Sequence, residues 1–355
     1  MLLLLGTTVL ISCNDEDELG DEVAHDTTPY NLDFGSFASP TIPSDNPMTV
    51  QGVLLGKMLF YDKALSGDGS LACAGCHRQE DAFTDTARFS TGIQGKQGGR
   101  QAMAIFNMLW HDNEFFWDGR AHLLRDQSIL PIQDELEMDE TLENVIAKLT
   151  AKKDYTDQFI RAFGSDEITS EKISFALEQF MNTIISNNSK YDQYLAGDVQ
   201  LSPSELRGKD LFFTEYNEHF PDKSGADCAH CHSGDNFQNN RYMNNGLDGD
   251  AGFKDLGRAK VTNNPRDNAK FKVTSLRNIA LTPPYMHDGR FNTLEEVVDH
   301  YNENLQASST IDPALEATRG TGLMLDSAEK ADLVAFLKTL TDQTLITNQE
   351  YASPF

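Results

Sequence analysis

The chain has 355 residues, enough for two domains that each bury a core of their own. Asp and Glu number 55 against 29 Lys and Arg, which gives a formal net charge of −26. A charge of this sign repels nucleic acid and anionic lipid, so it argues against both as partners and favours a basic partner.

An apolar run, LLLLGTTVLIS, occupies residues 2–12 and ends at Cys13. It is too short to span a bilayer as a mature helix and is typical of an export signal. The segment LISC resembles a bacterial lipobox, in which the cysteine is lipidated after cleavage. We therefore predict a signal peptide at 1–12, a lipidated Cys13 as the only membrane anchor, a flexible acidic tether at 13–40, and a periplasmic or cell-envelope location.

Four further cysteines fall in two short motifs, CAGCH at 73–77 and CAHCH at 228–232. C-x-x-C-H is the attachment motif of c-type haem, because two thiols bond to the vinyl groups and the adjacent histidine becomes an axial iron ligand. A disulfide or a zinc site would leave the repeated position of the histidine unexplained. Two covalent haems are predicted, with these attachment residues: Cys73, Cys76 and His77 for the first, and Cys228, Cys231 and His232 for the second.

The sequence around the two motifs is duplicated: GKMLFYD (56–62) precedes the first and GKDLFFT (208–214) the second. A capping box of Ser202 and Glu205, with Pro203 at the first helical position, predicts a helix start before the second copy. Apolar residues at helical spacing predict two more helices. Their stripes are Ile173, Leu177, Phe180 and Ile184, and Leu333, Phe336, Leu337 and Leu340.

No part of the chain shows a series of alternating strands. We therefore expect an all-α, loop-rich protein of two tandem cytochrome c-type haem domains, whose haems face a shared region between the domains. The predicted bounds are 41–195 for the N-terminal domain, 196–342 for the C-terminal domain and 343–355 for a C-terminal tail, with the polar run 186–200 as the connection.

A longer segment is also duplicated, and its first copy is called the WDGR phrase below. The two similar copies are WDGRAHLLRDQSILP at 117–131 and HDGRFNTLEEVVDHY at 287–301. In the second copy a Thr293/Glu296 capping box begins a helix with one apolar face. That face consists of Leu294, Val297, Val298 and Tyr301, and its counterpart in the first copy consists of Leu124, Gln127, Ser128 and Pro131. If each face covers a haem, the second iron meets a phenol, whereas the first meets a proline that cannot bind metal.

These segments, together with LSGDGSLACAGCH, FFWDGRA and LRNIALTPPYMHDGRF, make residues from about 40 to 342 resemble the bacterial di-haem cytochrome c peroxidase and MauG family. The resemblance implies that the N-terminal haem is peroxidatic and that the C-terminal haem transfers electrons. It implies a distal acid at Glu137, a polar neighbour at Gln127 and an aromatic between the haems at Trp117. It also implies hydrogen peroxide as the substrate, a cytochrome or similar redox protein as the electron donor, and a homodimer.

Chemistry supports the role of Glu137 independently. Splitting peroxide requires a proton to move from one oxygen to the other, and a carboxylate in a partly apolar pocket can carry it. Glu135 and Glu140 lie in the same acidic run, DELEMDE, and could compete for the role, or Glu137 could be a solvated helix-start residue. Trp117 could equally be a core aromatic, which is compatible with a role as an electron relay.

The sequence departs from the family's peroxidases at two positions. These commonly have a methionine where this chain has Tyr301, and a histidine in the loop after the first motif, whereas the loop 78–99 contains neither His nor Met. The tyrosine resembles MauG, which oxidises a partner protein. Because phenolate stabilises ferric over ferrous iron, we expect a low potential for the second haem. We expect the first haem to be five-coordinate and to need no reductive activation.

Other ligands remain open at both irons. For the second iron they are Met286, His287 and His300, although His300 is rotated by about 100° from the apolar helix face. For the first iron they are His111, His122, Met103 and Met108.

The resemblance also implies a calcium ion between the domains, held by backbone oxygens of Thr282 and Pro284 and by the side chain of Gln101, an oxygen ligand. The alternative is a hydrogen-bond network among the same groups. The function predicted is reduction of hydrogen peroxide to water, with the first haem open and the second ligated by Tyr301. Two alternatives remain, a MauG-like oxidase of a partner protein and a non-enzymatic di-haem electron carrier. The tryptophan through which MauG is thought to exchange with its substrate is missing, because SGAD precedes the second motif.

Overall fold

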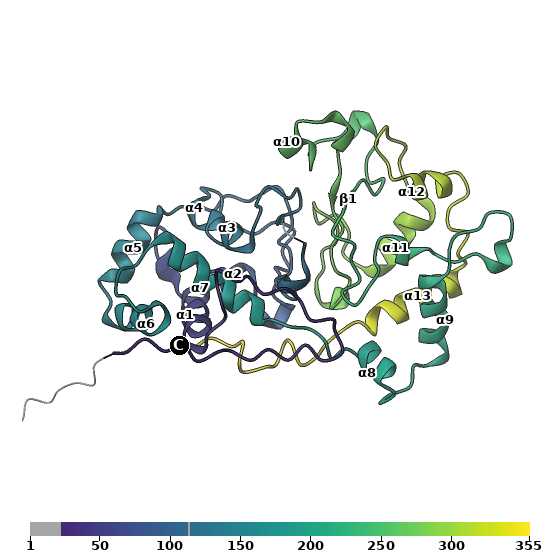
Figure 1. Cartoon of the computed structure of the whole chain (residues 1–355). Helices are drawn as coiled ribbons and strands as arrows, with labels where there is room; N and C mark the ends of the chain where they lie inside the picture. The colour runs from purple at the N-terminus through teal and green to yellow at the C-terminus, as the bar shows by residue number, and fades with distance from the viewer. Residues whose placement is uncertain (1–22, 113) are drawn as a thin grey trace, which may run out of the picture.

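The computed structural model describes residues 23–112 and 114–355, so the predicted signal peptide and Cys13 lie outside the described residues. Figure 1 shows two lobes. The first lobe contains α1 (Val50–Tyr61), α2 (Cys73–Cys76), α3 (Leu124–Ser128), α4 (Leu130–Gln133), α5 (Leu142–Thr150), α6 (Lys153–Phe163) and α7 (Ser170–Thr183). The second lobe contains α8 (Lys190–Ala196), α9 (Pro203–Phe213), α10 (Ala259–Thr262), α11 (Leu294–Glu303), α12 (Pro313–Thr318), α13 (Ser327–Lys338), and the strands β1 (Tyr242–Met243) and β2 (Phe271–Lys272).

The helix-rich, loop-rich character expected from the sequence is confirmed. The addition that the sequence did not predict is the antiparallel pair of β1 and β2, in which Tyr242 lies opposite Lys272 and Met243 opposite Phe271. Both predicted capping boxes form: Ser202 with Glu205 at the start of α9, and Thr293 with Glu296 at the start of α11. The side-chain oxygens of these caps satisfy backbone N–H groups that would otherwise lack a partner at a helix start.

The two lobes are built around equivalent helix pairs, α1 with α7 and α9 with α13. Each pair crosses at a glycine of the duplicated GK motif. A Cβ added to Gly56 would lie 1.9 Å from Ala176 O, and one added to Gly208 would lie 1.9 Å from Asp332 O. Since no side chain fits at these crossings, glycine permits the close helix approach. The structural repeat therefore matches the sequence repeat.

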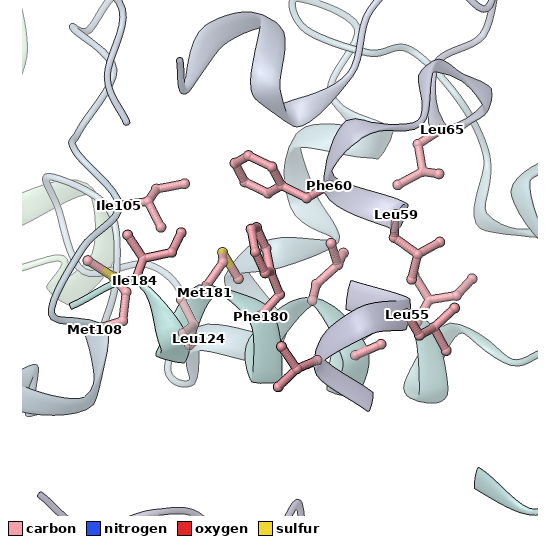
Figure 2. Packing of buried hydrophobic residues seen from close by; sticks show 14 of the residues in the cluster. Leu55, Leu59, Phe60, Leu65, Ile105, Met108, Leu124, Phe180, Met181 and Ile184 are labelled. Atoms are coloured by element: carbon pink, nitrogen blue, oxygen red, sulfur yellow. The ribbon is translucent and has the colours of Figure 1, made fainter. Parts of the chain in front are cut away.

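The first core lies between α1 and α7, as Figure 2 shows. Leu55, Leu59, Phe60 and Phe180 are almost completely buried there, and Met181 and Ile184 extend the same core. The predicted stripe of α7 is thus a core face. Burying side chains of this size contributes about 1.5–3 kcal/mol each.

The second core is an aromatic cluster between α9 and α13. The ring centroids of Phe212 and Phe336 lie 5.2 Å apart, and Phe237 packs 5.8 Å from Phe212. Tyr191 of α8 packs edge-on against Phe336, also at 5.2 Å. The run 186–200, predicted as a simple connection, therefore contains a helix that packs into the second core.

Residues 23–40 and the C-terminal segment both lie against the body of the molecule. In the segment 23–40, the rings of Phe34 and Phe37 pack on Trp110, whose indole N–H donates to Ala38 O at 2.8 Å. Part of the segment 13–40, predicted as a tether, thus contacts the body of the molecule through aromatic side chains. The C-terminal segment returns to the first lobe (yellow in Figure 1), where Leu345 and Tyr351 join the first core. None of the helices in the described part of the chain is long and apolar enough to span a membrane.

Candidate active site

The first C-x-x-C-H motif forms the short helix α2 followed by His77. The Nδ1–H of His77 donates to Phe83 O at 3.0 Å, which leaves Nε2 without a proton in the neutral ring. Burial lowers the pKa of His77, so the neutral form dominates at pH 7. A histidine held in this way presents a lone pair suited to an iron ion.

The second motif repeats this arrangement. The Nδ1 of His232 lies 3.1 Å from Phe237 O and 3.1 Å from Thr274 O, and burial lowers its pKa to about 4. None of the four motif cysteines forms a disulfide bond. The described residues contain no group of three or more His, Cys, Asp or Glu side chains suited to a metal ion, whereas one histidine beside two thiols fits haem attachment.

A cavity lined mainly by the second lobe, and at one side by first-lobe residues such as Gln101 and Trp117, brings the second motif and α11 together. It is called the cavity of the second lobe. Cys228, Cys231 and His232 line it on one side. Its other walls include the apolar side chains Leu294, Val297, Val298, Leu323, Leu333 and Leu337. A mostly apolar cavity with a few polar groups is the usual environment of a large planar cofactor, so these residues fit a haem.

Tyr301 faces this cavity from the end of α11, on the same helix face as Leu294, Val297 and Val298. Burial raises the pKa of its phenol to about 12, whereas a hydrogen bond from Asn245 Nδ2, at 3.4 Å, acts in the opposite direction. The phenol is therefore neutral at pH 7 unless a cation within reach stabilises the phenolate. A ferric iron would be such a cation.

The alternative ligands of the second iron are placed differently. Met286 lines the same cavity as Tyr301. His287 also borders it, but its ring is stacked on Phe271, with centroids 3.6 Å apart and an interplanar angle of 10°. His300 is buried, and its Nε2–H donates to Asn245 O at 2.9 Å, so this nitrogen is already occupied. Met286 is thus the main alternative to Tyr301.

Glu137 lies near the first motif. Burial raises the pKa of its carboxyl group, and the neighbouring charge of Asp134 adds to this shift. Burial is the main reason why the pKa of the Cys73 and Cys76 thiols is raised, and the charge of Glu137 adds to the shift, which places Glu137 within electrostatic range of both. A half-buried carboxyl group with a raised pKa is suited to proton transfer near neutral pH.

The two acidic neighbours of Glu137 have other surroundings. The side chain of Glu135 is 74% exposed. Glu140 is buried, but Lys148 Nζ and the Asn144 amide both bind its carboxylate. Neither therefore offers a free buried carboxyl group.

The helical face expected over the first haem is interrupted. α3 ends at Ser128 and α4 begins at Leu130, with Pro131 in the first turn of α4. Gln127 and Pro131 are both half-buried. This break arises because proline lacks an N–H and restricts the residue before it.

The alternative ligands of the first iron are scattered. Met108 belongs to the first core and His122 is exposed. His111 stacks on Phe115 at 6.0 Å, and Met103 borders the cavity of the second lobe.

Trp117 lies between the lobes. Its indole N–H donates to Gln101 O at 2.8 Å, while its carbonyl oxygen accepts from the backbone N–H of Lys272, also at 2.8 Å. Its side chain borders the cavity of the second lobe. One residue of the duplicated WDGR phrase is thus bonded to both lobes.

Ion pairs and hydrogen bonds hold this phrase against the second lobe, and sequence reasoning did not find them. Arg100 bridges Asp118 and Asp255, with N···O distances of 2.7 and 2.6 Å. Arg258 donates to Asp118 O at 3.0 Å and to Gly119 O at 2.9 Å. Isolated charged residues in loops carry no periodicity, so only the folded structure reveals these partners.

The three residues expected to bind calcium lie around one cavity. Gln101, Thr282 and Pro284 all border the cavity of the second lobe. Gln101 is buried, and its Nε2 donates to Thr84 Oγ1 at 3.0 Å and to Asp85 O at 3.1 Å. The side-chain oxygen of Gln101 and the backbone oxygens of Thr282 and Pro284 are of the types that bind calcium.

Comparisons with known proteins agree with this geometry. The family model described as di-haem cytochrome c peroxidase matches residues 50–200. The methylamine utilization protein MauG of Methylophilus methylotrophus is 34% identical over 301 residues, covering 84% of this chain and 84% of the relative. The cytochrome c551 peroxidase of Nitrosomonas europaea is 35% identical over 290 residues, covering 81% of this chain and 79% of the relative.

A solved structure shares the whole architecture. A crystal structure described as a MauG-like protein associated with microbial copper homeostasis superposes with a TM-score of 0.83 at 35% identity, covering 92% of this chain and 99% of the other. The di-haem peroxidase BthA of Burkholderia thailandensis shares the fold, with a TM-score of 0.70 at 22% identity and coverage of 94% and 98%. A di-haem family of this kind implies two c-type haems. The chain therefore belongs to the di-haem cytochrome c peroxidase and MauG family and is a peroxidase-like oxidoreductase.

Proposed function

We propose that this chain reduces hydrogen peroxide to water in the N-terminal lobe, with electrons that enter through the C-terminal lobe. Cys73, Cys76 and His77 would hold one haem, and Cys228, Cys231 and His232 would hold the other. The observation that carries the proposal is the half-buried Glu137, whose raised pKa and proximity to the first motif suit it to move a proton.

The haem supplies the iron centre at which peroxide gains electrons. The residues of the chain move the proton and keep the site accessible to peroxide. Glu137 would accept a proton from one peroxide oxygen and deliver it to the other, which leaves as water. Two electrons from the donor and two protons from solvent would convert the remaining oxygen into a second water. Gln127 and Pro131 border the site without providing a metal ligand, which keeps one face accessible to peroxide.

The second lobe has a different task. Tyr301, on the apolar wall of its cavity, would occupy the remaining position of a second haem iron, and that haem would then exchange electrons without binding peroxide. Trp117, bonded to both lobes, provides an aromatic ring along the route between them. The electron donor is a cytochrome or a similar redox protein, and the acidic surface favours a basic one.

The proposal has further parts that rest on the family or on the sequence alone. Gln101, Thr282 and Pro284 hold a calcium ion at the boundary between the lobes. The protein is exported to the periplasm or cell envelope, is anchored through a lipid on Cys13, and forms a homodimer. Its tandem haem domains follow the two equivalent helix pairs.

Glu137→Gln tests the function directly, because the amide cannot exchange the proton. We expect peroxide turnover to fall by about 10²–10⁴-fold while both haems remain attached. Glu135→Gln is the matched control, since this exposed glutamate lies in the same acidic run, and it should keep near-normal turnover. A Glu137→Gln variant that retains full turnover would remove the basis of the proposal.

Oxidation of a partner protein is the second candidate function. It is favoured by Tyr301, which stands where the family's peroxidases commonly have methionine, and by the similarity to the MauG proteins. The missing tryptophan before the second motif argues against the same route to a substrate. A purely electron-carrying protein would keep its electron-transfer rate in Glu137→Gln, which distinguishes that alternative from both enzymes.

A further inference from the structure

Asn245, in the loop after β1, contacts both side chains that could reach the second iron. Its Nδ2 lies 3.2 Å from Met286 Sδ and 3.4 Å from the Tyr301 hydroxyl oxygen. Its carbonyl oxygen accepts from His300 Nε2 at 2.9 Å. Two consecutive residues of α11, His300 and Tyr301, therefore bind the same asparagine, one through its backbone and the other through its side chain.

The loop around Asn245 is anchored independently of its side chain. The buried Asn244 donates from Nδ2 to Ser308 Oγ at 3.0 Å and to Thr310 Oγ1 at 2.9 Å. Gly246 N–H donates to Asn244 Oδ1 at 2.9 Å. A substitution at Asn245 should therefore remove the amide while leaving the loop in place.

Met286 is held where it can compete with Tyr301. Its φ of +73° is left-handed, a conformation that non-glycine residues rarely adopt. The equivalent residue of the first repeat, Phe116, has a φ of +70°, so the turn itself is part of the duplicated fold. The first repeat has a ring at this position, whereas the second presents a thioether to the cavity.

The two acceptors of the Asn245 amide differ in strength. A thioether sulfur is a weak acceptor, whereas the oxygen of a phenol is an ordinary hydrogen-bond acceptor. Donation from Asn245 therefore holds the hydroxyl oxygen of Tyr301 in position, and the same amide contacts the sulfur of Met286. Asn245 thus favours the Tyr301 oxygen over the Met286 sulfur as the atom that binds the second haem.

We propose that Asn245 is a positioning residue that selects Tyr301 over Met286 as the sixth ligand of the second haem and thereby sets its reduction potential. This inference rests on the proposed ligation by Tyr301 and goes beyond it, because it assigns the choice of ligand to a side chain that binds no metal. A neutral sulfur ligand raises a haem potential relative to an anionic oxygen ligand.

The test is Asn245→Leu in the full-length holoprotein, studied by optical absorption, electron paramagnetic resonance and redox titration. We expect the ratio of Tyr-ligated to Met-ligated second haem to fall at least tenfold. The phenolate-to-iron charge-transfer band should weaken, a sulfur-to-iron band should appear, and the midpoint potential of this haem should rise. In the double variant with Met286→Leu the sulfur band should be absent, which identifies its source.

Asn304→Leu is the matched control. This exposed asparagine lies just after α11, and its Nδ2 donates to Asp299 O. It should leave the spectrum and the potential unchanged. If Asn245→Leu fails to take up haem, Asn245→Ala removes the donor without adding bulk and is measured in the same way.

Two failures can be told apart. If Tyr301→Phe leaves the spectrum of the wild-type protein unaltered, the proposed ligation by Tyr301 is wrong. If Tyr301→Phe abolishes the phenolate band but the Asn245 variants keep both the wild-type band and the wild-type potential, the ligation stands and the role of Asn245 is overturned.

Discussion

At the scale of single residues, Glu137 and Tyr301 are both acids whose pKa is raised by burial, but their neighbours differ. Glu137 lies near Asp134 and Arg120, whose charges act in opposite directions on its pKa. Tyr301 receives a hydrogen bond from Asn245, which lowers its pKa. Glu137 is thus suited to exchanging a proton repeatedly. Tyr301 is suited to losing its proton once, when its oxygen binds a metal ion.

The raised pKa of Glu137 predicts the pH dependence of turnover. The carboxylate must be ionised to accept a proton, so activity should be lost as pH falls through the pKa of Glu137. Because burial raises that pKa above the ordinary value of 4.5, the loss should begin at a higher pH than for an exposed glutamate. The measurement is kcat/KM for peroxide against pH. An acid limb that persists unchanged in the residual activity of Glu137→Gln would assign it to another group.

At the scale of elements, the glycines at the helix crossings predict that replacement by alanine lowers stability, the opposite of its usual effect in a helix. Glycine to alanine inside a helix normally stabilises it, by up to about 1 kcal/mol. Gly56→Ala should instead destabilise the protein by about 1–3 kcal/mol or more, because the new Cβ would collide with the backbone of α7.

Thermal or urea unfolding measures this effect. Gly98→Ala is the control, since a Cβ at Gly98 has no neighbour within 4 Å, and its effect should stay within about 0.5 kcal/mol. Equal stability of Gly56→Ala and the wild type would mean that α1 and α7 do not pack as described.

Sequence reasoning predicted those elements whose signals are local. Capping boxes and apolar stripes identified α7, α9, α11 and α13, because caps and helical spacing depend on neighbouring residues. The same reasoning missed α8 and the packing of residues 23–40, whose aromatic side chains acquire partners only from distant parts of the chain. The role proposed for Asn245 had no signal at all, since nothing in the polar run MNNGLDG distinguishes one asparagine from the next.

At the scale of the whole molecule, Arg100 links the duplicated WDGR phrase to the second lobe. Its side chain is 17% exposed, and those of Asp118 and Asp255 are 6% and 19% exposed. Arg100→Met leaves two carboxylates without their shared cation and should destabilise the protein by about 3 kcal/mol. Arg207→Met is the control, because that arginine is 62% exposed and lies within one lobe, so losing its pair with Asp332 should have little effect on stability.

The effect of Arg100→Met should depend on pH with a defined sign. Burial alone would raise the pKa of Asp255, but hydrogen bonds from Arg100 and Lys260 hold it well below its ordinary value of 3.8. An aspartate whose pKa is lowered in the folded state stabilises that state at pH values above its ordinary pKa. This contribution is lost as the pH falls from the ordinary pKa through the lowered one. The difference in stability between the wild type and Arg100→Met should therefore shrink below about pH 4. A difference that is constant with pH would exclude this ion pair as its source.

The central claim is that two equivalent lobes hold unequal haem sites, one open beside Glu137 and one closed by Tyr301. Electron paramagnetic resonance of the resting ferric holoprotein tests it most directly. We predict one high-spin and one low-spin iron in equal amounts, with the low-spin signal altered in Tyr301→Phe and the high-spin signal unaltered. Two low-spin irons that do not respond to added peroxide would contradict the claim.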